Sequence, residues 1–183
     1  DVMPLLKSRT CTSEDYWNLP EGQRAELIDG QLYDMAPPSR VHQELVSAFV
    51  YSVRSHIQKN GGDCKVYPAP FAVNLDAEDK NWVEPDISVI CDKNKLTDRG
   101  CSGAPDWIVE IVSPSSRALD YSVKNTLYLQ SGVREYWIVD PAKERVTVYH
   151  YEADAAPTIY LFTDTIAVNI FDGLNFCIAD FLK

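Results

Sequence analysis

Short apolar runs, bounded by proline, glycine and polar turns, dominate the second half of this chain. Residues 87–90, 107–112 and 135–140 are almost continuously apolar, which is typical of strands buried on both faces. Residues 145–152 and 158–163 instead alternate between apolar and polar side chains, as an antiparallel hairpin or edge pair does. The pattern therefore predicts one sheet with buried central strands.

Two helices are predicted beside these strands. Residues 41–59 carry an apolar stripe with helical spacing, and Asn60-Gly-Gly should end a helix of about 28 Å there. The stripe consists of Val41, Leu45, Phe49, Val53 and Ile57. A second helix should follow Ser113-Pro-Ser-Ser, with its N-cap at Ser115 or Ser116, and run to about Ser131 before Gly132.

A hairpin is predicted near the N-terminus. Asp29-Gly30 lies between residues 24–28 and 31–35, and this dipeptide is a strong signal for a two-residue turn. A short helix at residues 13–18 should precede the hairpin, since Thr12 or Ser13 can cap it and Pro20 should end it.

The segments between the hairpin and the central strands are less regular. Residues 65–75 are predicted to form a strand that is irregular at its two prolines and pairs with the strand starting at Trp82. Residues 91–104 are predicted to be a polar loop, long enough to move. Residues 166–181 should supply a short apolar tail around Asp172-Gly173.

One charge interrupts the apolar strand at residues 107–112. Alternation puts Glu110 on the same face as Ile108 and Val112, and a buried carboxylate needs a partner or a metal. Asp106 shares this face, but the span between Asp106 and Glu110 is about 13 Å, whereas ligands converge to about 2–2.6 Å from one ion. The partner of Glu110 must therefore come from another strand.

Asp86 is the natural partner. It follows Pro85 and heads the apolar residues 87–90, a position that suits the start of a strand. Adjacent strands lie about 4.8 Å apart, so carboxylates on two of them can meet over one divalent cation. Asp86 and Glu110 are therefore the candidate metal ligands. The alternative is a capped turn aspartate and a core glutamate with a basic partner.

Several segments match a known family in order along the chain. The matching segments are RAELIDGQLYDMAPPS, His42 of SRVHQELV, Glu-Pro-Asp86, Glu110 in WIVEIVSPSSR, Lys124 in YSVKNTLYLQSGV, and REYWIVDP. Together they resemble the Uma-two-type family of restriction endonucleases, within the PD-(D/E)xK nuclease superfamily. The resemblance covers about residues 13–151.

The resemblance implies a restriction-endonuclease-like fold. That fold is a mixed β-sheet flanked by helices, here with an N-terminal hairpin and additional C-terminal strands, and it agrees with the α/β class that the elements predict. The chain departs from the superfamily signature at Val112, where a lysine is usual. The resemblance implies that Lys124 of the following helix supplies the amine instead; the alternative is an i, i+4 pair with Asp120.

Three further residues are candidates. Glu44 lies at the border of the helix stripe, and a first-helix acid joins the metal site in many related nucleases; the alternative is a solvated flank residue. Glu26 and His42 match the family pattern, with an exposed or paired strand glutamate and a surface or packing histidine as the alternatives. The candidate catalytic set is Asp86, Glu110, Lys124 and Glu44.

Composition fits a single domain of 183 residues, 45% of them hydrophobic and 24% charged. We expect residues 1–12 to be an N-terminal tail and residues 13–183 to form the domain. Seventeen basic against 27 acidic residues give a net charge of −10, which discourages a broad phosphate-binding surface. Nucleic acid would therefore bind through a local basic patch or with help from a metal.

The five cysteines form no CxxC pair, and their odd number suggests reduced thiols in a cytosolic setting. No apolar run approaches the roughly 18 residues of a membrane span, and no secretory signal pattern is present. We therefore expect a cytoplasmic protein that does not enter a membrane.

The favoured function is a Mg²⁺-dependent DNA endonuclease, with Mn²⁺ as another usable ion. Two carboxylates can hold an ion that activates water, and a lysine adds a compact positive charge near the scissile phosphate. The alternative is an inactive nuclease-like binding or assembly module, which the acidic net charge suggests. A weaker alternative is a sugar hydrolase with carboxyl groups about 5–9.5 Å apart. A homodimer is plausible, because cutting both strands often needs two sites.

Overall fold

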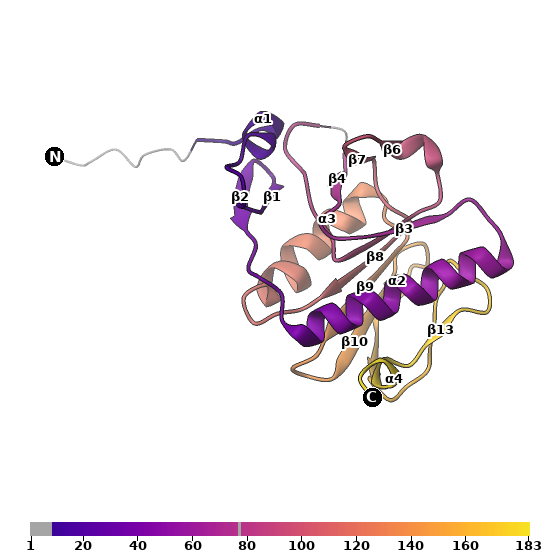
Figure 1. Cartoon of the computed structure of the whole chain (residues 1–183). Coiled ribbons are helices and arrows are strands. Elements are labelled where there is room, and N and C mark those ends of the chain that lie inside the picture. The colour runs from indigo at the N-terminus through magenta and orange to yellow at the C-terminus, as the bar shows by residue number, and fades with distance from the viewer. Residues whose placement is uncertain (1–8, 77) are drawn as a thin grey trace.

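A six-stranded mixed sheet forms the centre of the fold, with helices on its two faces (Figure 1). The computed structural model describes residues 9–76 and 78–183. The strands follow the order β11-β10-β9-β8-β5-β3, and β8 pairs parallel with β9 and antiparallel with β5. Their bounds are β3 Lys65–Pro68, β5 Ile87–Ile90, β8 Trp107–Ile111, β9 Glu135–Asp140, β10 Arg145–His150 and β11 Thr158–Leu161. The predicted strands 87–90, 107–112 and 135–140 are thus confirmed as the buried centre of the sheet.

Strand β8 divides its side chains between two apolar cores. Trp107 and Val109 lie in the core that contains the stripe of α2 (Arg40–Asn60), whereas Ile108 lies in the core that contains Tyr128 of α3 (Lys124–Ser131). In Figure 1 α2 crosses one face of the sheet and α3 lies behind it. Glu110 shares the face of Ile108 and therefore points toward α3, as alternation along the strand predicts.

The N-terminal hairpin has the predicted turn. β1 (Ala25–Ile28) pairs antiparallel with β2 (Gln31–Asp34), and Asp29 and Gly30 both have positive φ, as this turn requires. A Cβ at Gly30 would lie 2.4 Å from the Thr10 side chain, which would have to move to make room for it. The short helix α1 (Ser13–Trp17) precedes the hairpin and is confirmed.

The predicted tail at residues 1–12 lies mostly outside the described residues. Within its described part, the backbone N–H of Cys11 donates to the carbonyl of Gly30 at 2.8 Å. The N-terminal segment is therefore attached to the turn of the hairpin from residue 11 onward.

The prediction of a plain polar loop at residues 91–104 is wrong. This segment contains a short 3-10 helix η1 (Lys93–Lys95) and strands β6 (Leu96–Thr97) and β7 (Gly100–Ser102). β7 pairs parallel with β4 (Ala72–Asn74), forming a small second sheet. Gly100 has positive φ, and a Cβ there would lie 2.0 Å from the carbonyl oxygen of Ala72, so only glycine permits this pairing.

The predicted strand at residues 65–75 is divided into β3 and β4 around the cis peptide bond Ala69–Pro70. β3 pairs antiparallel with β5, as expected for the strand that follows Trp82, and Val73 adds an isolated antiparallel bridge to Val83. Proline cannot donate a ladder hydrogen bond, which explains why the strand is interrupted at this point.

The prediction that all five cysteines are reduced is wrong. Cys64, which precedes β3, and Cys91, which follows β5, form a disulfide, while Cys11, Cys101 and Cys177 are free thiols. Antiparallel pairing of β3 with β5 brings the two sulfurs together, and this pairing cannot be deduced from the spacing of the cysteines. The disulfide links the strand that follows α2 to the strand that follows Asp86.

The C-terminal segment completes the fold with short elements. β10 and β11 pair antiparallel, as predicted, and β12 (Ile166–Ala167) pairs with β13 (Asn175–Phe176) around the Asp172-Gly173 turn. The small helix α4 (Ile178–Phe181) packs near α2. Among the described residues, no helix combines the length and the apolar character that a membrane crossing requires.

Candidate active site

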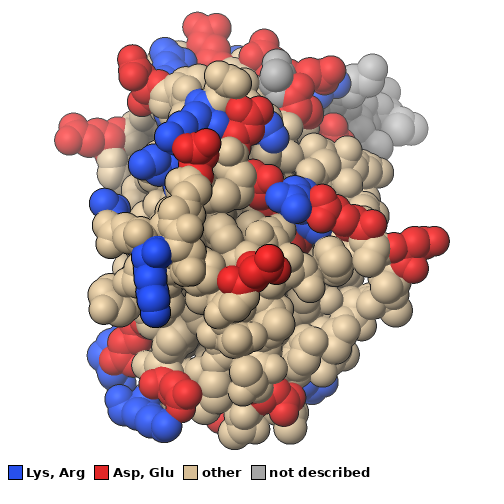
Figure 2. Space-filling view, turned by 90° about the vertical axis from the view of Figure 1, so that its right-hand side faces the viewer, with Lys and Arg blue, Asp and Glu red and all other residues tan. Residues whose placement is uncertain are grey.

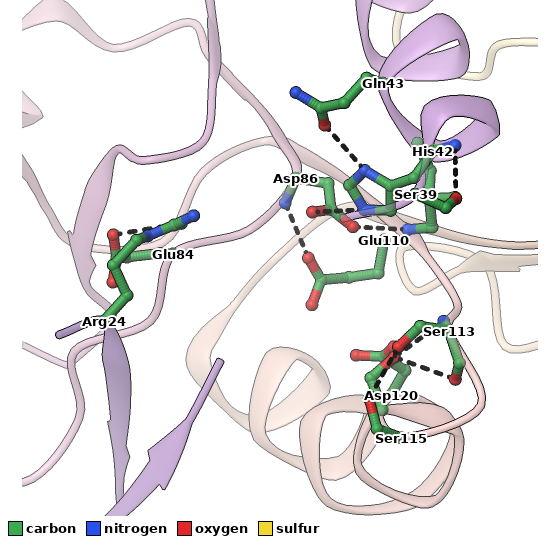
Figure 3. A network of polar contacts seen from close by, with 12 residues as sticks. Arg24, Ser39, His42, Gln43, Glu84, Asp86, Glu110, Ser113, Ser115 and Asp120 are labelled. Carbon is green, nitrogen blue, oxygen red and sulfur yellow. Dashed lines mark hydrogen bonds and ion pairs between the residues drawn. The ribbon is translucent and has the colours of Figure 1, made fainter. Parts of the chain in front are cut away.

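Asp86 and Glu110 face each other at the end of two adjacent strands. Ile87 pairs with Val109, so Asp86 lies opposite Glu110 across the β5–β8 pair. The Asp86 N–H donates to Glu110 Oε1 at 2.8 Å, and the Ile111 N–H donates to Asp86 Oδ2 at 2.7 Å (Figure 3). The structure therefore brings Asp86 and Glu110 together on neighbouring strands, where the carboxylate of each accepts a backbone N–H next to or at the other residue.

Lys124 reaches the same cluster from the helical segment after β8. Its Nζ lies 2.5 Å from Glu110 Oε2, 2.8 Å from Glu26 Oε2 and 3.4 Å from Asp120 Oδ1. The residue follows a π-helical turn, η2 (Leu119–Val123), and such wide turns are frequent at functional sites. The i, i+4 pair with Asp120 that was considered as an alternative thus exists together with the contact to Glu110.

Burial controls the protonation of this cluster. Burial raises the pKa of Glu110 well above its usual value, opposed by the Lys124 ammonium and reinforced by the charges of Asp120, Asp86 and Glu26. Burial alone lowers the pKa of Lys124, but Glu110 and Glu26 outweigh it and hold that pKa well above normal. Lys124 therefore stays positively charged, while burial raises the pKa of Asp120.

His42, from the first turn of α2, also contacts the cluster. Its Nε2 lies 3.1 Å from Asp86 Oδ1, and its Nδ1 lies 3.0 Å from Gln43 Oε1 (Figure 3). The Ser39 hydroxyl accepts the His42 backbone N–H at 3.1 Å and caps the helix, which fixes this turn. Burial lowers the pKa of His42, but the hydrogen bond and charge of Asp86 outweigh this effect and leave the pKa raised.

Glu44 is not brought to the cluster. Its carboxylate pairs with Arg40 one turn earlier, at 2.5 Å, and its side chain is 42% exposed. The helix explains the difference, because His42 precedes the buried Phe49 by seven residues, almost two full turns, and so lies on the same face. The spacing to Phe49 is a sequence signal that could have indicated that His42 faces the sheet, whereas Glu44 was the residue predicted for the site.

Two further residues belong to the cluster through tertiary contacts. Glu26, on β1, is buried, and its Oε1 accepts the backbone N–H of Glu84 at 2.8 Å while its Oε2 pairs with Lys124. The Tyr128 hydroxyl lies 3.4 Å from Glu110 Oε2. Glu26 was predicted only from family resemblance, and Tyr128 had no sequence signal beyond its position one turn after Lys124.

The cluster has a buried part and a surface part. The side chains of Glu110 and Lys124 are 3% and 5% exposed, whereas those of Asp86 and His42 are both 16% exposed. Solvent therefore reaches the site from the side of Asp86 and His42. Because Glu110 lies beneath this surface, the two carboxylates do not flank an open groove of the kind that sugar hydrolysis needs.

The donor chemistry of the cluster fits a hard divalent cation. Four carboxyl groups, from Glu26, Asp86, Glu110 and Asp120, lie around a single lysine and a histidine. Among the described residues, no three His, Cys, Asp or Glu side chains converge as a ready ligand set. Mg²⁺ retains several waters and is commonly bound through one or two carboxylates, so Asp86 and Glu110 are the residues that could hold it.

The face shown in Figure 2 carries no broad basic surface, since Lys and Arg are interspersed there with Asp and Glu around a largely uncharged centre. A hollow of about 530 Å³ lies over α2 and α4, lined by Arg40, Gln43, Tyr51 and Phe181 among others. It adjoins the site through Gln43 but does not open onto Asp86 or Glu110.

A protein-family model described as "Uma2: Putative restriction endonuclease" matches residues 13–179 of this chain. Two relatives come from Synechocystis sp. (strain ATCC 27184 / PCC 6803 / Kazusa). "Uncharacterized protein slr1290" is 27% identical over 144 residues, covering 77% of this chain and 74% of its own length. "Uncharacterized protein sll1609" is 23% identical over 173 residues, covering 92% and 94%.

A solved structure from Anabaena variabilis ATCC 29413, described as "a putative nuclease belonging to DUF820", has a similar fold. It aligns with a TM-score of 0.75 at 22% sequence identity, over 93% of this chain and 96% of that chain. The close match confirms the predicted restriction-endonuclease-like arrangement of a mixed sheet flanked by helices.

Proposed function

Since this chain belongs to the Uma2 family, we propose that it is a Mg²⁺-dependent endonuclease that hydrolyses phosphodiester bonds in DNA. The observation that carries the proposal is the meeting of Asp86, Glu110 and Lys124 at the end of the β5–β8 pair. An acid pair can hold a divalent ion that activates water, and an ammonium beside it can stabilise the negative charge that develops during hydrolysis.

Each residue of the set has a distinct task. Asp86 and Glu110 hold the ion, and Mg²⁺, when bound, supplies an activated water and offsets the charge on the phosphate. Lys124 places a fixed positive charge next to Glu110, where it stabilises negative charge that develops on the phosphate. Glu26 and Asp120 keep the ammonium in place, since they pair with it from two other elements.

DNA is the proposed substrate, and its binding must overcome the net charge of −10. Long-range attraction to phosphate is therefore weak, and the bound cation contributes a large part of the local positive charge. We accordingly expect binding to DNA to require the divalent ion, and we propose that cleavage of both strands uses two copies of the chain.

The second candidate function is an inactive nuclease-like module for binding or assembly. One observation favours it: Glu110 and Lys124 are buried and paired with each other, and an internal ion pair of this kind can serve structure alone. The two functions differ in whether the cluster binds a divalent ion and turns over substrate.

The test is cleavage of supercoiled plasmid DNA by the purified chain with Mg²⁺ or Mn²⁺, compared with E110Q and D86N. We expect nicking by the wild type and a rate at least about 100-fold lower in both variants, since each removes a negative ligand from the ion. The exposed Asp172 in the C-terminal turn provides a matched acid-to-amide control, D172N. Equal cleavage by wild type and E110Q would overturn the proposal, and no cleavage by the wild type would favour the inactive module.

A further inference from the structure

His42 and Asp86 are spaced like two neighbouring ligands of one ion. The distance from His42 Nε2 to Asp86 Oδ1 is 3.1 Å. In octahedral coordination with bonds of about 2.1 Å, adjacent ligand atoms lie about 3 Å apart. An ion can therefore replace the proton between these two atoms without a large movement of either side chain.

The second nitrogen of His42 is already oriented for such a role. Nδ1 lies 3.0 Å from Gln43 Oε1, an acceptor, so Nδ1 carries a hydrogen and Nε2 is the nitrogen that faces Asp86. Histidines that ligate metals almost always donate their other ring N–H to such an acceptor, which sets the tautomer. Without a proton or a cation between them, the lone pairs of Nε2 and Asp86 Oδ1 would repel each other.

The backbone holds the imidazole at this position. Ser39 caps α2 by accepting the His42 N–H, and α2 packs through Leu45 and Phe49 on the sheet that carries Asp86. His42 and Asp86 are also equally exposed, at 16%, on the side from which an ion enters. The site thus presents the nitrogen of His42 and an oxygen of Asp86 together at its entrance, with the carboxylate of Glu110 beneath.

We infer that His42 is a direct ligand of the divalent ion, together with Asp86, and that the site consequently selects Mn²⁺ or a similar first-row transition ion over Mg²⁺. The inference rests on the proposed metal-dependent function. Imidazole adds little to the binding of Mg²⁺, which prefers oxygen ligands, but it raises affinity along the first-row series. The residue thereby determines which ion the cluster uses.

The test is direct detection of the ligand in the full chain. Mn²⁺ and Mg²⁺ are titrated separately by calorimetry, and pulsed electron paramagnetic resonance of the Mn²⁺ complex detects ¹⁴N coupling from a bound imidazole. We expect wild type to bind Mn²⁺ about tenfold or more tightly than Mg²⁺, with clear ¹⁴N coupling. H42Q should lose the coupling and bind Mn²⁺ about 10–100-fold more weakly, with a smaller change for Mg²⁺.

His56 gives the matched control, because it lies on the same helix and contacts Asn60 and Phe171 rather than the acids. H56Q should retain the Mn²⁺ affinity and the ¹⁴N coupling of wild type. Persistence of the coupling in H42Q, its absence from wild type, or failure of wild type to bind Mn²⁺ would each overturn the inference.

Failure of the His42 ligand assignment can be distinguished from failure of the proposed nuclease function. If D86N and E110Q abolish plasmid cleavage while H42Q leaves the Mn²⁺ affinity unchanged, the nuclease proposal stands and His42 is not a ligand. If the Mn²⁺ complex shows the histidine coupling but no plasmid is cleaved, the ligand assignment stands and the nuclease proposal fails.

Discussion

Lys124 and Glu26 form a buried ion pair, 2.8 Å between Nζ and Oε2, that joins the helix after β8 to the N-terminal hairpin. The other oxygen of Glu26 accepts the backbone N–H of Glu84, two residues before Asp86. One carboxylate therefore holds both the lysine and the segment that delivers the first acid of the site, and it connects the geometry of the site to the hairpin.

Replacement of Glu26 should separate these two tasks. E26Q keeps an oxygen for the Glu84 N–H but loses the charge that faces Lys124, whereas E26A loses both. Because an unsatisfied buried N–H costs about 1–3 kcal/mol, E26A should be destabilised by about that much more than E26Q. Urea unfolding followed by circular dichroism measures the difference, and equal stability of the two variants would contradict the assigned hydrogen bond.

Loss of the lysine charge should destabilise the fold. K124M leaves Glu110, Glu26 and Asp120 buried without their cation, and breaking a buried pair from one side costs about 3–5 kcal/mol. Burial already raises the folded pKa of Glu110, and removing Lys124 raises it further. A raised folded pKa gives stability that is present at low pH and lost as pH rises, so the deficit of K124M should shrink on acidification. Urea midpoints measured across pH would show this; a deficit that grows at low pH would contradict it.

Arginine at position 124 should separate the fold from the chemistry. K124R retains a positive charge for the buried acids, but a planar guanidinium cannot put its charge where the compact ammonium lies. We expect cleavage to fall by about 100–1000-fold, with divalent-ion affinity measured by calorimetry within a few-fold of wild type. Full activity in K124R would show that the positive charge of Lys124 serves only to stabilise the buried acids, and that the ammonium has no specific role in cleavage.

Glu135, which lies outside the candidate active site, should make the free energy of unfolding depend on pH. Burial raises its pKa from the usual 4.5 to about 7, although Trp137 and the backbone N–H groups of Asn169 and Ile170 lower it in part. The pKa of Glu135 is higher in the folded than in the unfolded chain. Its contribution to the free energy of unfolding, about 3 kcal/mol, is therefore complete below about pH 4.5 and is lost as the pH rises to about 7.

The variant E135Q should remove this part of the pH dependence. Thermal unfolding of wild type and E135Q between pH 4.5 and 8 measures it, with D172N in the exposed C-terminal turn as a control that keeps the wild-type slope. Parallel stability curves for wild type and E135Q would show that Glu135 ionises normally in the fold.

The disulfide predicts how many cysteines an alkylating reagent can label. Alkylation of the unfolded chain without reductant should label Cys11, Cys101 and Cys177, and reductant should add Cys64 and Cys91. Reduction should also lower the free energy of unfolding by about 2–4 kcal/mol, because the bond closes a loop across 27 residues of separation in the unfolded chain. A C64A/C91A double variant should be insensitive to reductant, and labelling of all five thiols without reductant would exclude the bond.

Local pattern was sufficient for most elements, though not for residues 91–104, and for the choice of the central acid pair. The apolar runs at residues 87–90 and 107–112 predicted buried strands, and the single charge within the second run needed a polar partner from another strand. Asp86 and Glu110 were therefore predictable, because period-two alternation fixes which face of a strand a side chain occupies. The Asp29-Gly30 turn was predictable for a similarly local reason, since few dipeptides accept two positive φ angles.

Contacts between distant segments had no such signal. Three contacts depend on how helices and hairpins pack on the sheet: that of His42 with Asp86, that of Glu26 with Lys124, and the bond between Cys64 and Cys91. Gly100 likewise matters only because Ala72 comes within contact distance of it. The sequence by itself determined which residues lie on each element and face; only the tertiary structure decided which faces meet, because packing sums many weak contacts that no single segment encodes.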